Sequence, residues 1–485
     1  MTQGGDINMF IILPEIFLGV MACVVLVVGS ITKLKQTNLS FTLTLLALGL
    51  SAISIILLSS NEASNAFNGL IIKDGLSDVA KFMICVFTIL ILVYGHRYFK
   101  EISLYGSELF TLILLGTLGM MVMVSSVHLI SLYLGLELMA LSLYALIALR
   151  SNSIESTESA MKYFVLGALA SGILLYGISF IYGSIGSLDF ESINQLMIEE
   201  SNRGLAPIFA LIMILVGLLF KFGVFPFHMW VPDVYQGSPT PITGLVASVT
   251  KIAALVVFLR LIAISFESFL DVWQGMLIVV ALLSIAFGNL VAIAQRNIKR
   301  MLAYSTISHM GFVLLGILTG DEHGQSAALL YVLIYAGISV GVFGCIILLA
   351  FKGFEADNLD DYRGLSEKDP WLAFLLLLFM FSLAGVPPTI GFYAKLSILQ
   401  ALIGSGLLWV AIPSVMVTVV GAFYYLRVIK LMYFDKPDVL GQKKSHARTL
   451  DVRTVLILNG FLSIGIMPWA GSILIICQNA IRSMG

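Results

Sequence analysis

Four charged side chains lie within or at the end of long apolar stretches of this sequence, and they give the strongest indication of its chemistry. They are Glu137, Lys221, Lys251 and Lys395. A charge at the centre of a bilayer costs at least about 2.5 kcal/mol, so such residues usually face a protein interior or water. One carboxylate and three lysines in this setting indicate reversible proton transfer.

A proton relay is the chemistry that these residue types favour. Burial makes it harder for a lysine to hold its proton, and a nearby carboxylate makes it easier. A carboxylate that moves closer or farther away therefore loads or unloads the lysine. We expect Glu137 and Lys221 to form such a pair, and Lys251 to pass the proton onward.

Three further ionizable residues are secondary candidates for the relay. Glu108 begins an apolar stretch, and His309 lies within one. An imidazole titrates near neutral pH, although a histidine inside a helix is more often a packing residue. Lys162 follows Glu158 by four residues and shares a helix face with it, so a structural ion pair at the membrane surface is an equal alternative.

The composition argues against several other classes of chemistry. The formal net charge is −1, from 27 basic and 28 acidic residues, so nothing indicates nucleic-acid binding. The four cysteines lie far apart in apolar stretches without metal-ligand spacing, so we expect no metal site, iron–sulfur cluster or disulfide framework. Neither a Walker A sequence nor a GxGxxG motif that opens a βαβ unit is present, which argues against nucleotide binding.

The amino-acid composition predicts an all-α polytopic membrane protein with a single transmembrane domain over residues 1–485. Of the 485 residues, 59% are hydrophobic and only 11% are charged, with a mean hydropathy of +1.01. One membrane span needs about 20 apolar residues. On that basis we predict about fourteen transmembrane helices, at residues 9–31, 39–59, 78–94, 107–124, 128–149, 160–183, 206–225, 242–264, 272–294, 301–319, 326–351, 371–395, 407–433 and 455–476.

The basic residues predict the orientation of these helices. Seventeen Lys and Arg residues lie in the odd-numbered loops, against three in the even-numbered loops and the C-terminal tail. Loops rich in Lys and Arg face the cytoplasm, so both termini are expected on the opposite, periplasmic side. Three basic residues near span ends, Lys81, Arg260 and Arg427, are expected to extend to the membrane interface.

Two of the spans contain a helix-breaking sequence. Gly-Val followed by proline occurs at residues 223–226 in span seven and at 385–388 in span twelve. Proline removes a backbone donor and interrupts a helix. Two unrelated proline kinks would also explain the pattern, but broken helices in matching positions point to a transport site between repeats.

The two breaks predict an internal repeat. They are 162 residues and five spans apart, so spans four to eight and nine to thirteen look like two copies of one five-helix unit. Because five is odd, the second copy must be inverted in the membrane. The domain then divides into N-terminal helices, a first repeat, a second repeat and a last helix, at residues 9–106, 107–264, 272–433 and 455–476.

Three stretches of the sequence resemble a known family. They read KFGVFPFHMWVPDVYQGSPTP at 221–241, KYFVLGALASG at 162–172 and KRMLAYSTISHMG at 299–311. They are similar to the antiporter-like subunit N family of bacterial NADH-quinone oxidoreductase, respiratory complex I, whose mitochondrial counterpart is subunit 2. The resemblance extends over essentially the whole chain.

This resemblance implies a proton-translocating membrane subunit of a larger oxidoreductase. Other subunits would bind FMN, iron–sulfur clusters, NADH and quinone, and this chain would bind no cofactor. Its partners would be the other membrane and peripheral subunits of the complex, and phospholipids. The location would be the bacterial inner membrane or, alternatively, the mitochondrial one. Ionizable family positions match Glu108, Glu137, Lys162, Lys221, Lys251 and Lys395, which are thereby implicated in the proton path.

One departure from the broader antiporter pattern lies in span eleven. Residues 326–350 contain no Lys, His, Asp or Glu, whereas the larger antiporter-like subunits carry an ionizable group there. The departure fits the subunit N family and leaves the second repeat short of a relay residue, so water or His309 would have to bridge the gap.

Two other functions remain open at this stage. One is a subunit of a multi-subunit cation/proton antiporter. The other is a membrane scaffold that moves no ion, against which the embedded charges argue. Relatives of the complex that use hydrogenase or ferredoxin chemistry are a further alternative.

Overall fold

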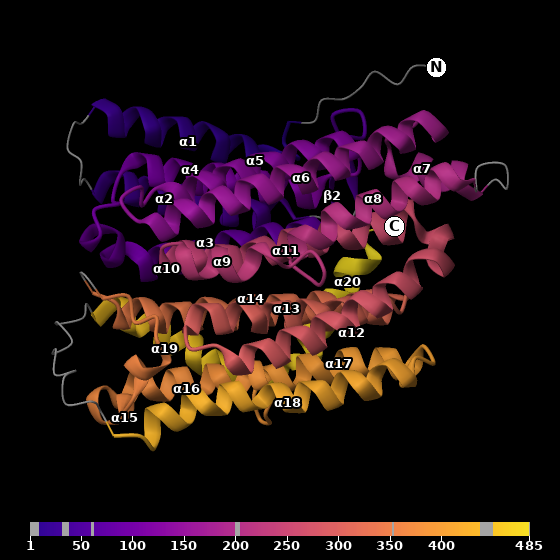
Figure 1. The fold of residues 1–485 in the computed structure, drawn as a ribbon. Coiled ribbons are helices and arrows are strands. Elements are labelled where there is room, and N and C mark those ends of the chain that lie inside the picture. The colour runs from indigo at the N-terminus through magenta and orange to yellow at the C-terminus, as the bar shows by residue number, and fades with distance from the viewer. Residues whose placement is uncertain are drawn as a thin grey trace.

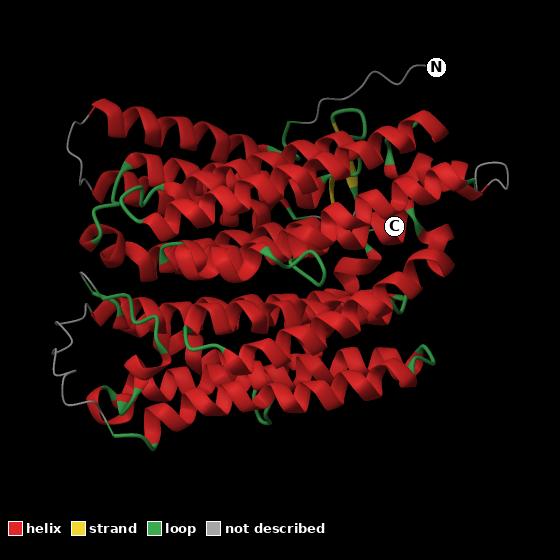
Figure 2. Cartoon of the chain, in the orientation of Figure 1, coloured by secondary structure: helices red, strands yellow, loops and turns green. Residues whose placement is uncertain are grey.

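The chain forms two groups of helices that run side by side (Figure 1). The computed structural model describes residues 9–31, 38–59, 63–198, 204–351, 354–436 and 450–484. The N-terminal half, indigo to magenta, makes one group, and the C-terminal half, orange to yellow, makes the other. Nearly all of the described chain is helical (Figure 2).

The elements of the N-terminal half include one short antiparallel hairpin. In chain order they are α1 (Leu13–Ile31), α2 (Asn38–Leu58), β1 (Ser64–Ala66), β2 (Ile71–Lys73), α3 (Gly75–Glu101), α4 (Ser107–Ser125), α5 (Leu129–Ala148), α6 (Ile154–Ile185), α7 (Phe190–Ile198), α8 (Leu205–Phe222), α9 (Trp230–Gly237), α10 (Thr240–Ala247) and α11 (Val249–Arg260).

The elements of the C-terminal half are all helices in the described residues. In chain order they are α12 (Leu270–Ala294), α13 (Ile298–Ile317), α14 (Glu322–Leu349), α15 (Leu365–Lys368), α16 (Pro370–Ala384), α17 (Ile390–Gly404), α18 (Leu408–Tyr433), α19 (Leu450–Gly465) and α20 (Ala470–Arg482).

The helical membrane fold is confirmed, whereas the count of fourteen spans is not. Among the described residues, eleven helices are long and apolar enough to cross a membrane, and α19 with α20, bent by 53°, would make twelve. The predicted tenth and twelfth spans fall on α13, which is not one of these, and on α16 and α17, which are apolar but short. Charges at the start of α13 and the break between α16 and α17 account for the difference.

The helices between the two groups are the most deeply buried. α11 buries all of its residues, and α14 contacts α3, α10 and α11 on one side and α13, α16 and α17 on the other. The outer helices instead expose large apolar side chains, such as Leu57 on α2 and Leu169 on α6. Such surfaces are expected where a helix faces lipid.

Two closely packed helix pairs take matching places in the predicted repeats. A Cβ on Gly119 of α4 would lie 2.7 Å from the carbonyl oxygen of Gly135 on α5. A Cβ on Gly288 of α12 would likewise lie 2.7 Å from the carbonyl oxygen of Tyr304 on α13. Small residues let membrane helices approach closely. The match supports an internal repeat, and the division at 107–264 and 272–433 stays a prediction.

Two of the basic residues expected at the membrane interface are buried instead. Arg260 is fully buried, and its two terminal nitrogens donate to both carboxylate oxygens of Asp74 at 2.7 and 2.8 Å. Lys81 pairs with Glu15 at 2.5 Å, and both side chains are buried. The prediction was wrong because acidic partners far away in the sequence meet these cations inside the protein. Arg427 is half-buried and donates to backbone carbonyls of α12 and its C-terminal cap.

The buried Asp74–Arg260 pair leads to a stability prediction. Asp74→Asn keeps an N-cap side chain at the start of α3, because asparagine caps helices as well as aspartate, but it leaves the Arg260 charge uncompensated. We expect a loss of about 3–5 kcal/mol, measured as a lower thermal unfolding midpoint of the purified protein. Glu101→Ala, which breaks the exposed pair with Arg97, should cost less than about 1 kcal/mol. Equally small losses of stability in Asp74→Asn and Glu101→Ala would contradict the prediction.

Candidate proton-transfer site

The first break separates α8 from α9. α8 ends at Phe222, and Gly223 adopts a φ of +73°, a left-handed conformation that favours glycine. The N–H groups of Gly223 and Val224 donate back to the carbonyls of Phe220 and Leu219. This turn ends the helix and leaves its last carbonyls without helical partners.

Lys251 of α11 binds these last carbonyls. Its Nζ donates to the carbonyl oxygens of Lys221 at 3.2 Å and Phe222 at 2.9 Å. The side chain is fully buried, and its Nζ lies 5.1 Å from the centroid of the Trp230 ring. The ammonium therefore lies at the negative end of the α8 dipole, against an aromatic face that also attracts cations.

The second break has the same geometry 162 residues later. α16 ends at Ala384, and Gly385 adopts a φ of +80° with the same backward hydrogen bonds as at the first break. Lys395 of α17 donates from Nζ to the carbonyl oxygens of Leu383 and Ala384 at 3.1 and 2.8 Å. The four acceptors occupy equivalent positions in the two breaks, although Lys251 and Lys395 do not.

Glu137 and Lys221 lie close together without forming a salt bridge. Lys221 is 5% exposed, and its Nζ has no hydrogen-bond partner among the residues that the structure describes. One carboxylate oxygen of Glu137 and the hydroxyl of Tyr144 are buried in the same way. The Glu137 carboxylate acts electrostatically on both groups. Buried polar atoms normally have a hydrogen-bond partner from protein or ordered water, and a bridging water would suit proton transfer between groups that do not touch.

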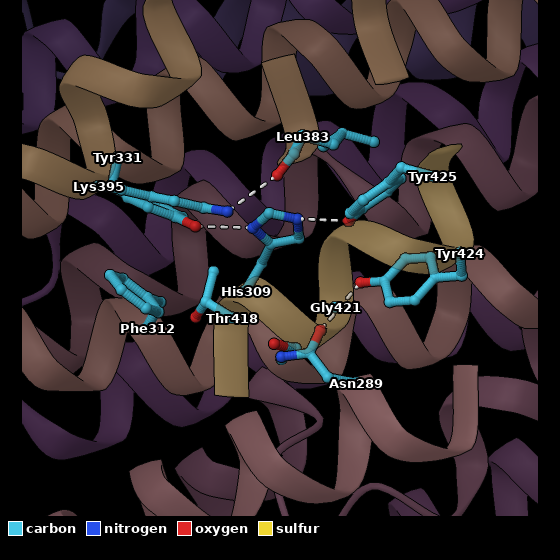
Figure 3. A pocket seen from close by; sticks show the side chains of 11 residues that line it. Asn289, His309, Phe312, Tyr331, Leu383, Lys395, Thr418, Gly421, Tyr424 and Tyr425 are labelled. Atoms are coloured by element: carbon cyan, nitrogen blue, oxygen red, sulfur yellow. Dashed lines mark hydrogen bonds between the residues drawn. The ribbon is translucent and has the colours of Figure 1, made fainter. Parts of the chain in front are cut away.

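A small cavity lies beside the second break (Figure 3). His309, Lys395, Asn289, Tyr331 and Tyr425 contribute to its walls, and it has room for about one water molecule. The His309 Nδ1 lies 2.7 Å from the Tyr331 hydroxyl, and its Nε2 lies 2.9 Å from the Tyr425 hydroxyl. Both ring nitrogens are therefore hydrogen-bonded in the cavity that Lys395 shares.

The other secondary candidates lie at the surface. Glu108 is exposed at the start of α4. Lys162 is 45% exposed and pairs with Glu158 at 2.7 Å and with Asp233 at 2.8 Å. Lys162 thus forms the ion pair with Glu158 that the sequence spacing suggested. It also pairs with Asp233 of α9, a partner that the sequence did not reveal.

Asp233 connects three helices at this surface. It accepts from Lys162 of α6 and, at 2.7 Å, from Arg300 of α13. Partial burial alone would raise the pKa of Asp233, but the two cations lower it below its usual value. The carboxylate therefore holds α9 between the first and second helix groups.

The tyrosines of the site were not among the residues predicted from the sequence. Tyr331 and Tyr335 lie four residues apart on α14, in the span without Lys, His, Asp or Glu, and both rings pack near His309. Tyr425 comes from α18. Their spacing along one helix face was the only available signal, and it is equally typical of aromatic packing.

Comparison with known proteins places the chain in a family. Residues 126–421 match the family described as NADH:quinone oxidoreductase/Mrp antiporter, transmembrane. The NADH-quinone oxidoreductase subunit N of Thioalkalivibrio sulfidiphilus is 49% identical over 460 residues, which cover 94% of this chain and 95% of that protein. The chain belongs to the NADH-quinone oxidoreductase subunit N family. The resemblance stated from the sequence motifs is thereby confirmed.

Solved structures place the subunit N family in a wider fold. A chain of respiratory complex I from Thermus thermophilus with bound aureothin has a TM-score of 0.79 at 30% identity, covering 95% of this chain and 98% of that one. A chain of the Mrp complex from Dietzia sp. DQ12-45-1b has a TM-score of 0.86 at 19% identity, covering 98% of both. The second similarity shows a shared fold alone.

The second break leads to a prediction about Lys395. A Cβ on Gly385 would lie 2.8 Å from the Lys395 Cδ and 3.2 Å from its Nζ, at a φ that strains any other residue. We expect Gly385→Ala to displace Lys395 from its carbonyls and to cost about 1–2 kcal/mol. The readouts are the thermal unfolding midpoint and proton pumping. Gly404→Ala is the control, because its Cβ would enter open space. Equal effects of the two variants would contradict a role of Gly385 in positioning Lys395.

Proposed function

We propose that this chain is a proton-translocating membrane subunit of an NADH-quinone oxidoreductase. It couples electron transfer from NADH to quinone, which takes place in other subunits, to proton movement through buried Glu and Lys residues. Family membership supports this function. The structural observation that carries it is the pair of broken helices whose carboxyl ends each bind a lysine, buried at the first break and partly buried at the second.

In the first half, the relay consists of Glu137, Lys221 and Lys251. A shift of the Glu137 carboxylate changes how strongly Lys221 holds its proton, because the two charges interact across a buried space. Lys251 binds the carbonyl of Lys221 itself. Loss of the Lys251 proton weakens that attachment, since a neutral amine is no longer attracted to the α8 dipole. Proton transfer and the position of the helix end are thus coupled.

In the second half, the relay consists of His309 and Lys395. Lys395 holds the end of α16 as Lys251 holds the end of α8. A neutral imidazole accepts a proton at one ring nitrogen and releases it from the other, and hydroxyls lie at both nitrogens of His309. His309 therefore supplies the step for which residues 326–350 contain no Lys, His, Asp or Glu.

The surface residues Lys162 and Glu108 are secondary members of the path. Both are accessible to water or to a neighbouring subunit. We further propose a bacterial inner membrane location with both termini periplasmic, in contact with phospholipids and the other subunits of the complex. FMN, iron–sulfur clusters, NADH and quinone would be bound by those subunits. Among the described residues of this chain, no group of His, Cys, Asp and Glu could hold a metal ion.

The Lys251 ammonium provides the direct test. Lys251→Ala removes the charge at the end of α8, and we expect proton pumping and coupled NADH-quinone reductase activity to fall at least about tenfold, or about 1.4 kcal/mol of barrier. The measurement uses inside-out membrane vesicles in which the assembled complex has been verified. Lys430→Ala, an exposed lysine on α18, should retain normal activity. Full pumping by the assembled Lys251→Ala complex would refute the relay.

Two further experiments distinguish the proposed function from a cation/proton antiporter and from a membrane scaffold. Proton exchange that requires sodium or potassium, measured with the purified protein in liposomes, would favour a cation/proton antiporter. A triple variant without charge at Glu137, Lys221 and Lys251 tests the scaffold. A scaffold would still support normal pumping in the assembled complex, whereas a relay would not.

A further inference from the structure

A chain of hydroxyl groups continues from His309 away from Lys395. The Tyr425 hydroxyl lies 2.9 Å from the His309 Nε2 and 2.5 Å from the Ser305 Oγ. Ser305 and His309 are four residues apart on α13, so both lie on the same helix face. Tyr425 of α18 therefore joins two polar groups that are one turn apart on a neighbouring helix.

A second small cavity lies beside Ser305, at the end of the contact with Tyr425. Ser305, Thr306, Tyr335 and Ser339 contribute to its walls, and it too has room for about one water molecule. The Thr306 Oγ1 lies 2.7 Å from the Tyr335 hydroxyl. The hydroxyls of α13 and α14 thus meet around a space in which one water could bond to several of them.

Beyond this cavity the polar groups reach α9. The Tyr235 phenol of α9 is fully buried, and its hydroxyl has no hydrogen-bond partner among the described residues, although Thr306 and Tyr335 are near enough to act on it electrostatically. α9 begins at Trp230, whose ring covers Lys251. Buried hydroxyls therefore lead from the cavity of the second break to the helix that follows the first break.

The chemistry of these groups suits proton transfer better than packing. A hydroxyl both donates and accepts hydrogen bonds, so a series of them can pass a proton on. Burying a hydroxyl costs free energy unless it is hydrogen-bonded, and phenylalanine would fill nearly the same volume as tyrosine without needing a partner. The helix α14, which has no Lys, His, Asp or Glu between residues 326 and 350, contributes two of these hydroxyls, Tyr331 and Tyr335.

We propose that Tyr425 transfers protons between His309 and Ser305, and so joins the Lys395 cavity to the hydroxyls that lead to α9. As the Nε2–H bond of a protonated His309 breaks, an O–H bond forms on Tyr425, and the original Tyr425 proton moves to the Ser305 oxygen. Ser305 gives its own proton to a water or to Tyr335 in the second cavity. Tyr425 and Ser305 each gain one proton and lose one, so no charge stays on either of them; His309 becomes neutral, and the excess proton ends on the acceptor in the second cavity. This role rests on the proposed function.

The test removes one hydroxyl and leaves the ring in place. Tyr425→Phe in the assembled complex should lower proton pumping in inside-out vesicles at least about tenfold, or about 1.4 kcal/mol of barrier. The solvent isotope effect on the pumping rate should rise, because a proton transfer becomes limiting. A purely structural role of the hydroxyl would leave that isotope effect unchanged.

A matched control measures the cost of losing a buried hydroxyl elsewhere. The Tyr362 hydroxyl is buried but does not belong to the series of hydroxyls described above. It donates to the Ala356 carbonyl at 3.0 Å. Tyr362→Phe should keep the pumping rate and the isotope effect of the unmodified complex. If Tyr425→Phe fails to assemble, Ser305→Ala, a smaller change at the next link, should show the same loss, and Ser305→Thr should restore it.

The outcomes separate this inference from the proposed function. If Lys251→Ala abolishes pumping while Tyr425→Phe and Ser305→Ala pump normally, the role of Tyr425 is refuted and the relay stands. If all three variants pump normally, the proposed function itself fails. Loss of pumping in Tyr425→Phe and Ser305→Ala with a raised isotope effect, and normal pumping in Tyr362→Phe, supports the transfer role.

Discussion

Two helices end inside the membrane-embedded part of this protein, and their terminal carbonyls need partners. In hydrocarbon no water is available to free backbone groups, so an interrupted helix is tolerated only where protein or trapped water satisfies them. Here the partner is a lysine ammonium at both ends. A structural need of the backbone thus places a protonatable group at each interruption, and the stability of each break depends on whether that group is charged.

The two halves meet the same need in different ways. The acceptor carbonyls are equivalent under the 162-residue repeat, but Lys251 comes from the following span and Lys395 from the second part of the broken helix itself. Lys251 is sealed against Trp230, whereas Lys395 lies in a cavity with His309. The same backbone geometry is therefore combined with two separate chemical environments, one packed against an aromatic ring and one open to a small cavity.

The sequence predicted the elements whose signals are local. Apolar length predicted the membrane fold, Gly-Val-Pro patterns predicted both breaks, and isolated charges in apolar stretches predicted the lysines that bind them. Long-range partners could not be predicted, because nothing near Arg260 in the sequence points to Asp74. The hydroxyls of Tyr331 and Tyr425 were missed because tyrosine in an apolar span is equally typical of packing. The count of fourteen spans is not confirmed at α13 or at α16 and α17, where a break divides one apolar stretch into two short helices.

The docking of α19 and α20 on α3 has a consequence for biogenesis. Asn459 of α19 donates to the Tyr94 hydroxyl, α20 packs against α3 and α14, and Arg482 pairs with Glu322 at the start of α14. α3 leaves the ribosome long before these helices do. Until they are made, lipid or an insertion factor must cover the surface of α3 that α19 and α20 contact. A chain truncated before α19 would leave this part of α3 uncovered, and exposed apolar surface of this kind makes incompletely folded chains prone to aggregation.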